Sequence, residues 1–175
     1  MGILGLFVFF VVRNESAKHQ VPPEESTSVE EGLARQEVRT QVLGFGERLR
    51  EVSLLAPTAP ADIERVYRPY VTRSLLSAWI SYPQNAPGRE TSSPWPDHID
   101  IAEVTMSDDA SAATVTGVLV YMTSEGIASN TDAGSETIAL TLVPEDGVWK
   151  IDRYEVIRTN SANAPRTQGE RPMLE

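Results

Sequence analysis

The chain has 175 residues, of which 41% are hydrophobic and 23% charged, and its formal net charge is −10. This size and composition predict one globular domain with room for a segment at either end. The acidic balance, spread along the chain, argues against nucleic acid as a partner, because phosphate binding requires a clustered basic surface. The sequence has no cysteine and only two histidines, His19 and His98. We therefore expect neither a metal site nor a cofactor.

An unbroken apolar run, Gly2 to Val12, opens the chain. It is shorter than the roughly 20 residues that span a bilayer. A buried core helix is disfavoured because the polar segment that follows offers no core to join. A cleaved signal peptide is disfavoured because no basic residue precedes the run and no small-x-small site follows it. We predict a membrane anchor at residues 1–12, whose beginning precedes this sequence, and a linker at residues 13–28.

The orientation of this anchor is predicted from its flanking charges. Arg13 and Lys18 follow the apolar run, and the positive-inside rule alone would keep that side cytoplasmic. Basic residues in the preceding part of the anchor would reverse the orientation. We expect the domain to be membrane-anchored on the extracytoplasmic side.

The strongest helical pattern covers residues 29–55. Apolar residues recur there at alternating steps of four and three, which places them on one face: Val38, Val42, Phe45, Leu49 and Val52. We expect this stripe to pack on a sheet, and a membrane-proximal coiled coil is the alternative. Two short helices are predicted next, one from Asp62 to Tyr67 and one from Arg73 to Ile80 that is capped by Thr72.

After a long loop at residues 82–96, the apolar period changes from helical to two. Alternating runs around residues 99–101, 115–121, 137–142 and 149–152 predict four β-strands. Short connections predict an antiparallel meander with the helices on one face, which is an α+β fold. The domain is predicted at residues 29–158, followed by a disordered tail at residues 159–175.

The closing run Gly147-Val148-Trp149-Lys150-Ile151-Asp152-Arg153-Tyr154 resembles the last strand of the nuclear transport factor 2-like superfamily. The loop at residues 86–96 is similar to that of uncharacterised bacterial membrane-anchored members. The resemblance implies a cystatin-like cone, in which a curved four-stranded sheet wraps a long helix. The superfamily includes isomerases, dehydratases, cyclases, binding modules and assembly domains. Its enzymes commonly hold an Asp or an Asp–His pair inside the cone, but no catalytic residue is carried over here.

Aromatic residues gather where the short helices meet the long loop: Tyr67, Tyr70, Trp79, Tyr82 and Trp95. One interpretation is the mouth of a ligand pocket in which Arg89 binds an anion. The other, which we favour, is that these rings close the open end of the cone and Arg89 fastens the loop through backbone carbonyls. Large aromatic side chains serve as such plugs because each buries about 150–250 Å².

A second candidate site lies on the first predicted strand. His98 and Asp100 are two residues apart and share a face, so they could work as an acid–base pair. That face is opposite Ile99 and Ile101. We favour a solvated strand face over catalysis, since a catalytic base needs a water-excluded pocket to tune its pKa.

These observations predict a membrane-tethered, non-enzymatic domain that binds a protein partner or a second copy of itself. The alternative is a small-molecule binding protein, or a cyclase- or isomerase-like enzyme, that uses the interior of the cone. A homodimer is expected through the outer sheet face, which the resemblance indicates and two exposed valines favour. That face carries Thr114, Thr116, Val118, Val120, Met122, Thr137, Ala139 and Thr141.

Overall fold

The computed structural model describes residues 23–129 and 131–158, with side chains from residue 29 onward. The predicted anchor, the first part of the predicted linker and the predicted tail lie outside these residues. Within the described part, no helix is long and apolar enough to cross a membrane.

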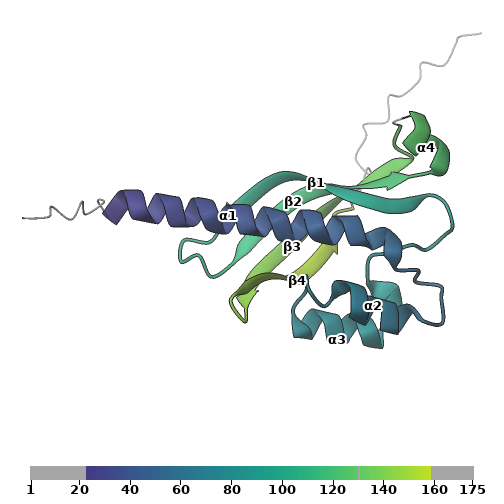
Figure 1. Ribbon diagram of the computed structural model, residues 1–175, viewed down its shortest axis with the longest axis horizontal. Coiled ribbons are helices and arrows are strands. Elements are labelled where there is room, and N and C mark those ends of the chain that lie inside the picture. The colour runs from purple at the N-terminus through teal and green to yellow at the C-terminus, as the bar shows by residue number, and fades with distance from the viewer. Residues whose placement is uncertain (1–22, 130, 159–175) are drawn as a thin grey trace, which may run out of the picture.

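The described chain is an α+β domain, as predicted. Its strands are β1 (Trp95–Met106), β2 (Ala113–Met122), β3 (Gly134–Glu145) and β4 (Val148–Val156), which form one antiparallel sheet in the order β1-β2-β3-β4. Its helices are α1 (Pro23–Arg48), α2 (Ala59–Tyr67), α3 (Arg73–Ser81) and α4 (Ser124–Ser129), with 3-10 turns η1 (Leu49–Glu51) and η2 (Pro83–Asn85). Figure 1 shows α1 running across the sheet, with α2 and α3 together near its C-terminal end.

Helix α1 begins earlier than the sequence indicates. It starts at Pro23, so the prediction that residues 23–28 belong to a linker was wrong. Proline suits the first helical position, because its missing N–H would have no intrahelical partner there and its φ is already helical. The α-helix ends at Arg48, before the predicted end at Leu55, since η1 follows and Val52 is already extended (φ −101°, ψ 117°).

The stripe on α1 packs against the inner face of the sheet. Its five members, Val38, Val42, Phe45, Leu49 and Val52, are all 0% exposed. Opposite them the strands contribute Ile99, Val104, Val115, Leu119, Ile138, Leu140, Leu142 and Ile151. Gly46 permits a close approach, since a Cβ there would lie 2.9 Å from the backbone N of Ile99. The coiled-coil alternative is wrong for this stripe, because no part of it is exposed.

The smaller helices follow the predicted order. Thr72 caps α3 as predicted, because its Oγ1 accepts a hydrogen bond from the backbone N–H of Leu75 at 3.3 Å. Helix α4 was not predicted. It has only 6 residues, too few to display a helical period. It is fixed locally, because Thr123 Oγ1 accepts from the Gly126 N–H at 2.9 Å.

Candidate functional site

The concave side of the sheet is filled by aromatic rings from four different elements. Phe45 of α1 lies with its ring centroid 5.1 Å from Tyr67 of α2, 6.2 Å from Trp79 of α3 and 6.5 Å from Tyr154 of β4. Their edge-on and stacked arrangements are the favourable ones for aromatic pairs. This side of the sheet is therefore occupied by the protein's own side chains.

Tyr67 anchors this cluster to the long loop. It is 0% exposed, and its hydroxyl donates a hydrogen bond to the carbonyl oxygen of Pro87 at 2.7 Å. Burial raises the pKa of the Tyr67 phenol, because the phenolate would be desolvated there. The contact satisfies both polar groups, so the loop is tied over the end of the aromatic cluster.

The structure brings together only some of the residues predicted for a pocket mouth. Tyr67, Tyr70 and Trp79 lie together around Phe45. Tyr82 is 60% exposed. Trp95 pairs with Met122 at the start of β1, and strand alternation puts both on the outer face. The predicted pocket mouth is thus divided between two faces of the sheet.

Arg89 fastens the loop through its backbone. Its N–H donates to the Val52 carbonyl at 2.8 Å, and its carbonyl accepts from the Leu54 N–H at 2.9 Å. Its side-chain Nε is buried without a hydrogen-bond partner among the described residues. Arg89 therefore fastens the loop, as the sequence suggested, but it does so through its own backbone N–H and carbonyl groups and not through its guanidinium.

His98 and Asp100 lie on the outer face of β1, where they pair with Val120 and Val118 of β2. Their side chains are 42% and 73% exposed. Asp97 Oδ2 lies 3.0 Å from His98 Nδ1, whereas Asp100 Oδ1 is 3.7 Å from His98 Nε2. The pair is therefore solvent-exposed and separated from the concave side by the sheet itself.

A polar hollow that the sequence did not indicate opens at the end of the concave side. Two adjoining cavities of about 460 and 280 Å³ share six lining residues: Gly88, Glu90, Tyr121, Glu136, Val156 and Arg158. We call them the mouth hollow. The Tyr121 hydroxyl donates to Glu136 Oε2 at 3.0 Å. Burial, followed by Glu136 and Glu90, raises the pKa of Tyr121, so both carboxylates act on this space.

Little in the amino-acid pattern indicates the mouth hollow. Glu90 lies in a loop and Glu136 in β3, and only the return of β3 alongside β2 places Glu136 beside Tyr121. Burial, with Tyr121 and Glu136 nearby, also raises the pKa of Tyr154. The two carboxylates outnumber the one cation of the lining, Arg158, and together with two phenol rings they could hold a small organic cation.

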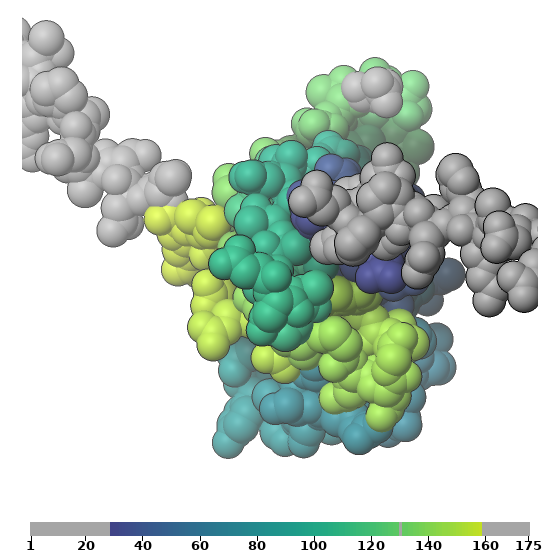
Figure 2. Space-filling model, turned by 90° about the vertical axis from the view of Figure 1, so that its left-hand side faces the viewer, coloured from purple at the N-terminus to yellow at the C-terminus, as the bar shows by residue number. Residues whose placement is uncertain are grey.

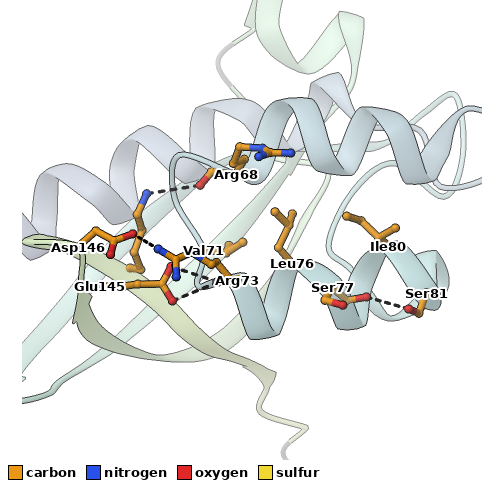
Figure 3. A pocket seen from close by; sticks show the side chains of 10 residues that line it. Arg68, Val71, Arg73, Leu76, Ser77, Ile80, Ser81, Glu145 and Asp146 are labelled. Atoms are coloured by element: carbon orange, nitrogen blue, oxygen red, sulfur yellow. Dashed lines mark hydrogen bonds and ion pairs between the residues drawn. The ribbon is translucent and has the colours of Figure 1, made fainter.

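A separate groove lies between α3 and the β3–β4 turn (Figure 3). It measures about 390 Å³ and has Val71, Leu76 and Ile80 among its apolar lining residues. Arg73 pairs with both Glu145 and Asp146 across it, and the Asp146 contact raises the pKa of Arg73. These ion pairs tie α3 to the turn, which gives the charged rim a structural role.

The outer face of the two central strands is uncharged. It carries Thr114, Thr116, Val118, Thr137, Ala139 and Thr141, all partly or fully exposed. Met122 on the same face is buried at 8% exposure, and Val120 is buried at 3% exposure, so the expectation of two exposed valines was wrong for Val120. Charged residues stand on the flanking strands, with Asp100 and Glu103 on β1 and Arg153 and Glu155 on β4. The centre of this face is therefore uncharged, and the charged residues lie along its margins.

No protein-family model and no curated protein matches the chain. Among solved structures it is similar to the intermembrane space region of the chloroplast protein ARC6, at 19% identity and a TM-score of 0.37 over 77% of this chain and 96% of that one. An NTF2-like protein with a cystatin-like fold from Novosphingobium aromaticivorans is similar at 14% identity and a TM-score of 0.46, over 79% of this chain and 90% of that one. TraE, in complex with 4-(1H-pyrrol-1-yl)pyridine-2-carboxylic acid, is similar at 12% identity and a TM-score of 0.44, over 73% of this chain and 96% of that one. At these values the similarities assign neither an activity nor a partner.

Proposed function

We propose that this chain is a membrane-tethered, non-enzymatic assembly domain of the nuclear transport factor 2-like type, anchored by residues 1–12 on the extracytoplasmic side. The observation that carries the proposal is the filled concave side. Phe45, Tyr67, Trp79 and Tyr154 occupy the space in which a cone-shaped enzyme would hold its substrate. Binding is therefore assigned to the outside of the domain.

The partner surface is the outer face of β2 and β3, and the partner is a second copy of the chain. Val118 lies near the middle of this face, flanked by Asp100 on β1 and Thr137 on β3. A two-fold pairing of such faces would bury an uncharged centre and leave the charged margins in water, which avoids the cost of burying unpaired charge.

Sedimentation of the full chain in detergent tests this interface. Val118→Asp would bury a charge at the centre of the dimer, and we expect it to raise Kd about 30-fold, equivalent to ~2 kcal/mol. Leu55→Asp is the matched control, because Leu55 is 77% exposed in the η1–α2 connection. Equal dissociation constants for the two variants would remove the outer face as the interface.

The tether is tested by labelling one introduced thiol. The chain has no cysteine, so Ser161→Cys gives a single reporter for a membrane-impermeant maleimide. We expect labelling of intact cells, which would place the domain outside the cytoplasm. Protection until lysis would place it inside and overturn the proposed location.

The mouth hollow favours a second candidate function, the binding of a small organic cation. Glu90 and Glu136 supply two negative charges against the one positive charge of Arg158, and Tyr121 and Tyr154 supply aromatic rings. Calorimetric titration with butylammonium measures this binding, and butanol is the uncharged control. We expect saturable binding of the cation alone, weakened about tenfold in Glu136→Gln. Heats that match those of butanol would exclude this function for the hollow.

A further inference from the structure

Helix α1 carries a second stripe on the side that faces away from the sheet. Val29 and Leu33 are each 61% exposed and Leu43 is 47% exposed. We define the outer stripe of α1 as Val29, Leu33, Gln36, Thr40 and Leu43. Its members are spaced by four, three, four and three residues, which is the spacing of a coiled-coil seam. At 3.6 residues per turn, this stripe lies opposite the buried stripe of Val38, Val42 and Phe45.

The polar members of the outer stripe are suited to a helix contact. Thr40 directs its hydroxyl to the Gln36 carbonyl at 3.0 Å, so its donor is already satisfied by the helix backbone. Gln36 is uncharged and lies in the middle of the stripe. A polar residue in a seam can fix register at a cost in stability, and two of the five positions here, Gln36 and Thr40, are polar.

The early turns of α1 are held by Ala34, which packs against the core, and by Arg35, which donates to the Val104 carbonyl at 2.6 Å, while Val29 and Leu33 stay exposed. Val38 is the first fully buried side chain of the helix. A hollow of about 480 Å³ lies between Glu30, Glu31 and Ala34 and the β1–β2 turn. Figure 1 shows α1 extending beyond the sheet, and Figure 2 shows this end beside the β1–β2 hairpin (teal) and the β3–β4 hairpin (yellow-green). Short helical segments are marginal in water unless an apolar face is packed.

We infer that the outer stripe of α1 packs in parallel against the same stripe of a second copy of this chain. The parallel direction rests on the proposed membrane tether, because two copies anchored through residues 1–12 in one membrane would begin α1 at the same height. The flanking charges agree. In an antiparallel pair, the side of the stripe that carries Glu30 and Glu37 would face the same side of the second copy, and the like charges would repel each other. In a parallel pair, Glu37 lies beside Gly32 of the second copy and Arg39 lies beside its Gly44, so no like charges meet.

This contact and the outer sheet face lie on opposite sides of the molecule. The sheet separates the outer face from α1, and the buried stripe separates the sheet from the outer stripe. One partner therefore cannot cover both surfaces. Two isologous contacts on opposite sides join copies into an open row rather than a closed dimer, so the chain would form rows along the membrane.

Disulfide trapping of the full chain in its membrane tests the helix contact. Leu33→Cys places a thiol in the outer stripe, and Glu31→Cys places one on the opposite side of the same turn at the same height. We expect Leu33→Cys to form disulfide dimers about tenfold faster or more, because the contact raises the effective thiol concentration above that of lateral collision. Equal rates, or no dimer from Leu33→Cys, would overturn the inference.

Two further variants separate the outcomes. Mixed chains carrying Leu33→Cys and Leu43→Cys would cross-link to each other only in an antiparallel pair, and that result would overturn the parallel arrangement. Adding Thr137→Cys with a bismaleimide tests the row. Cross-linked species larger than dimers from the double variant would support both contacts. If the double variant gives only the dimers that Leu33→Cys gives by itself, the helix contact stands and the sheet-face interface is contradicted.

Discussion

The two faces of strand β3 differ sharply, although they alternate residue by residue. On the concave side, Ile138, Leu140 and Leu142 are at most 1% exposed. On the outer face, Thr137, Ala139 and Thr141 are partly or fully exposed and bear no charge. The concave face supplies the burial that holds the fold together, and the outer face contributes little to it. The outer face of β3, which bears no charge and adds little burial to the fold, belongs to the surface proposed above for assembly.

Replacing the central ring of the concave side should have the largest effect on stability. We expect Phe45→Ala to lower the free energy of unfolding by about 4 kcal/mol, because it leaves a cavity among Tyr67, Trp79 and Tyr154. Urea denaturation measures this loss. Leu43→Ala, on the exposed side of the same helix, is the control and should cost far less. Similar losses in both variants would mean that the concave side is loosely packed.

Alkaline pH should loosen the concave side through its buried tyrosines. Burial raises the pKa values of Tyr67, Tyr121 and Tyr154 above their ordinary value. The unfolded chain therefore loses these protons near pH 10 while the folded chain keeps them, so stability is full below pH 10 and falls as pH rises, by about 1.4 kcal/mol per pH unit for each group. Denaturation between pH 9 and pH 11 measures the slope.

The Tyr67→Phe variant tests whether buried tyrosines cause the loss of stability at alkaline pH. It should remove roughly a third of the alkaline slope, and at pH 7 it should cost about 1–2 kcal/mol by leaving the buried Pro87 carbonyl without its donor. An unchanged slope would show that other groups cause the alkaline loss, and that the cluster is open to water.

The outer face should tolerate polar changes at its edge. We expect Asp100→Asn to change the free energy of unfolding by less than about 0.5 kcal/mol, because Asp100 is 73% exposed. Thermal unfolding measures it, with Ala139→Asp on a central strand as the comparison. A loss above 1 kcal/mol in Asp100→Asn would reveal a structural role for the His98 pair.

The periods of the sequence predicted the strands and the main helix well, because each buried face repeats locally. The stripe from Val38 to Val52 and the alternation in β3 are of this kind. The mouth hollow could not be predicted, since Glu90 and Glu136 line one space only after β1 pairs with β2 and β2 pairs with β3. Trp95 was expected at the pocket mouth, and its face was decided by its pairing with Met122. The outer stripe of α1 was missed because the stronger buried stripe shares the same helix.

Labelling of adjacent thiols on β3 tests the central contrast most directly. Thr137→Cys faces outward and Ile138→Cys faces the filled concave side, in a chain without other cysteines. We predict fast maleimide labelling at residue 137 that slows as the protein concentration rises, and labelling at residue 138 limited by unfolding. If residue 138 were labelled as fast as residue 137 in the folded protein, the concave side would be an open pocket and the account would be contradicted.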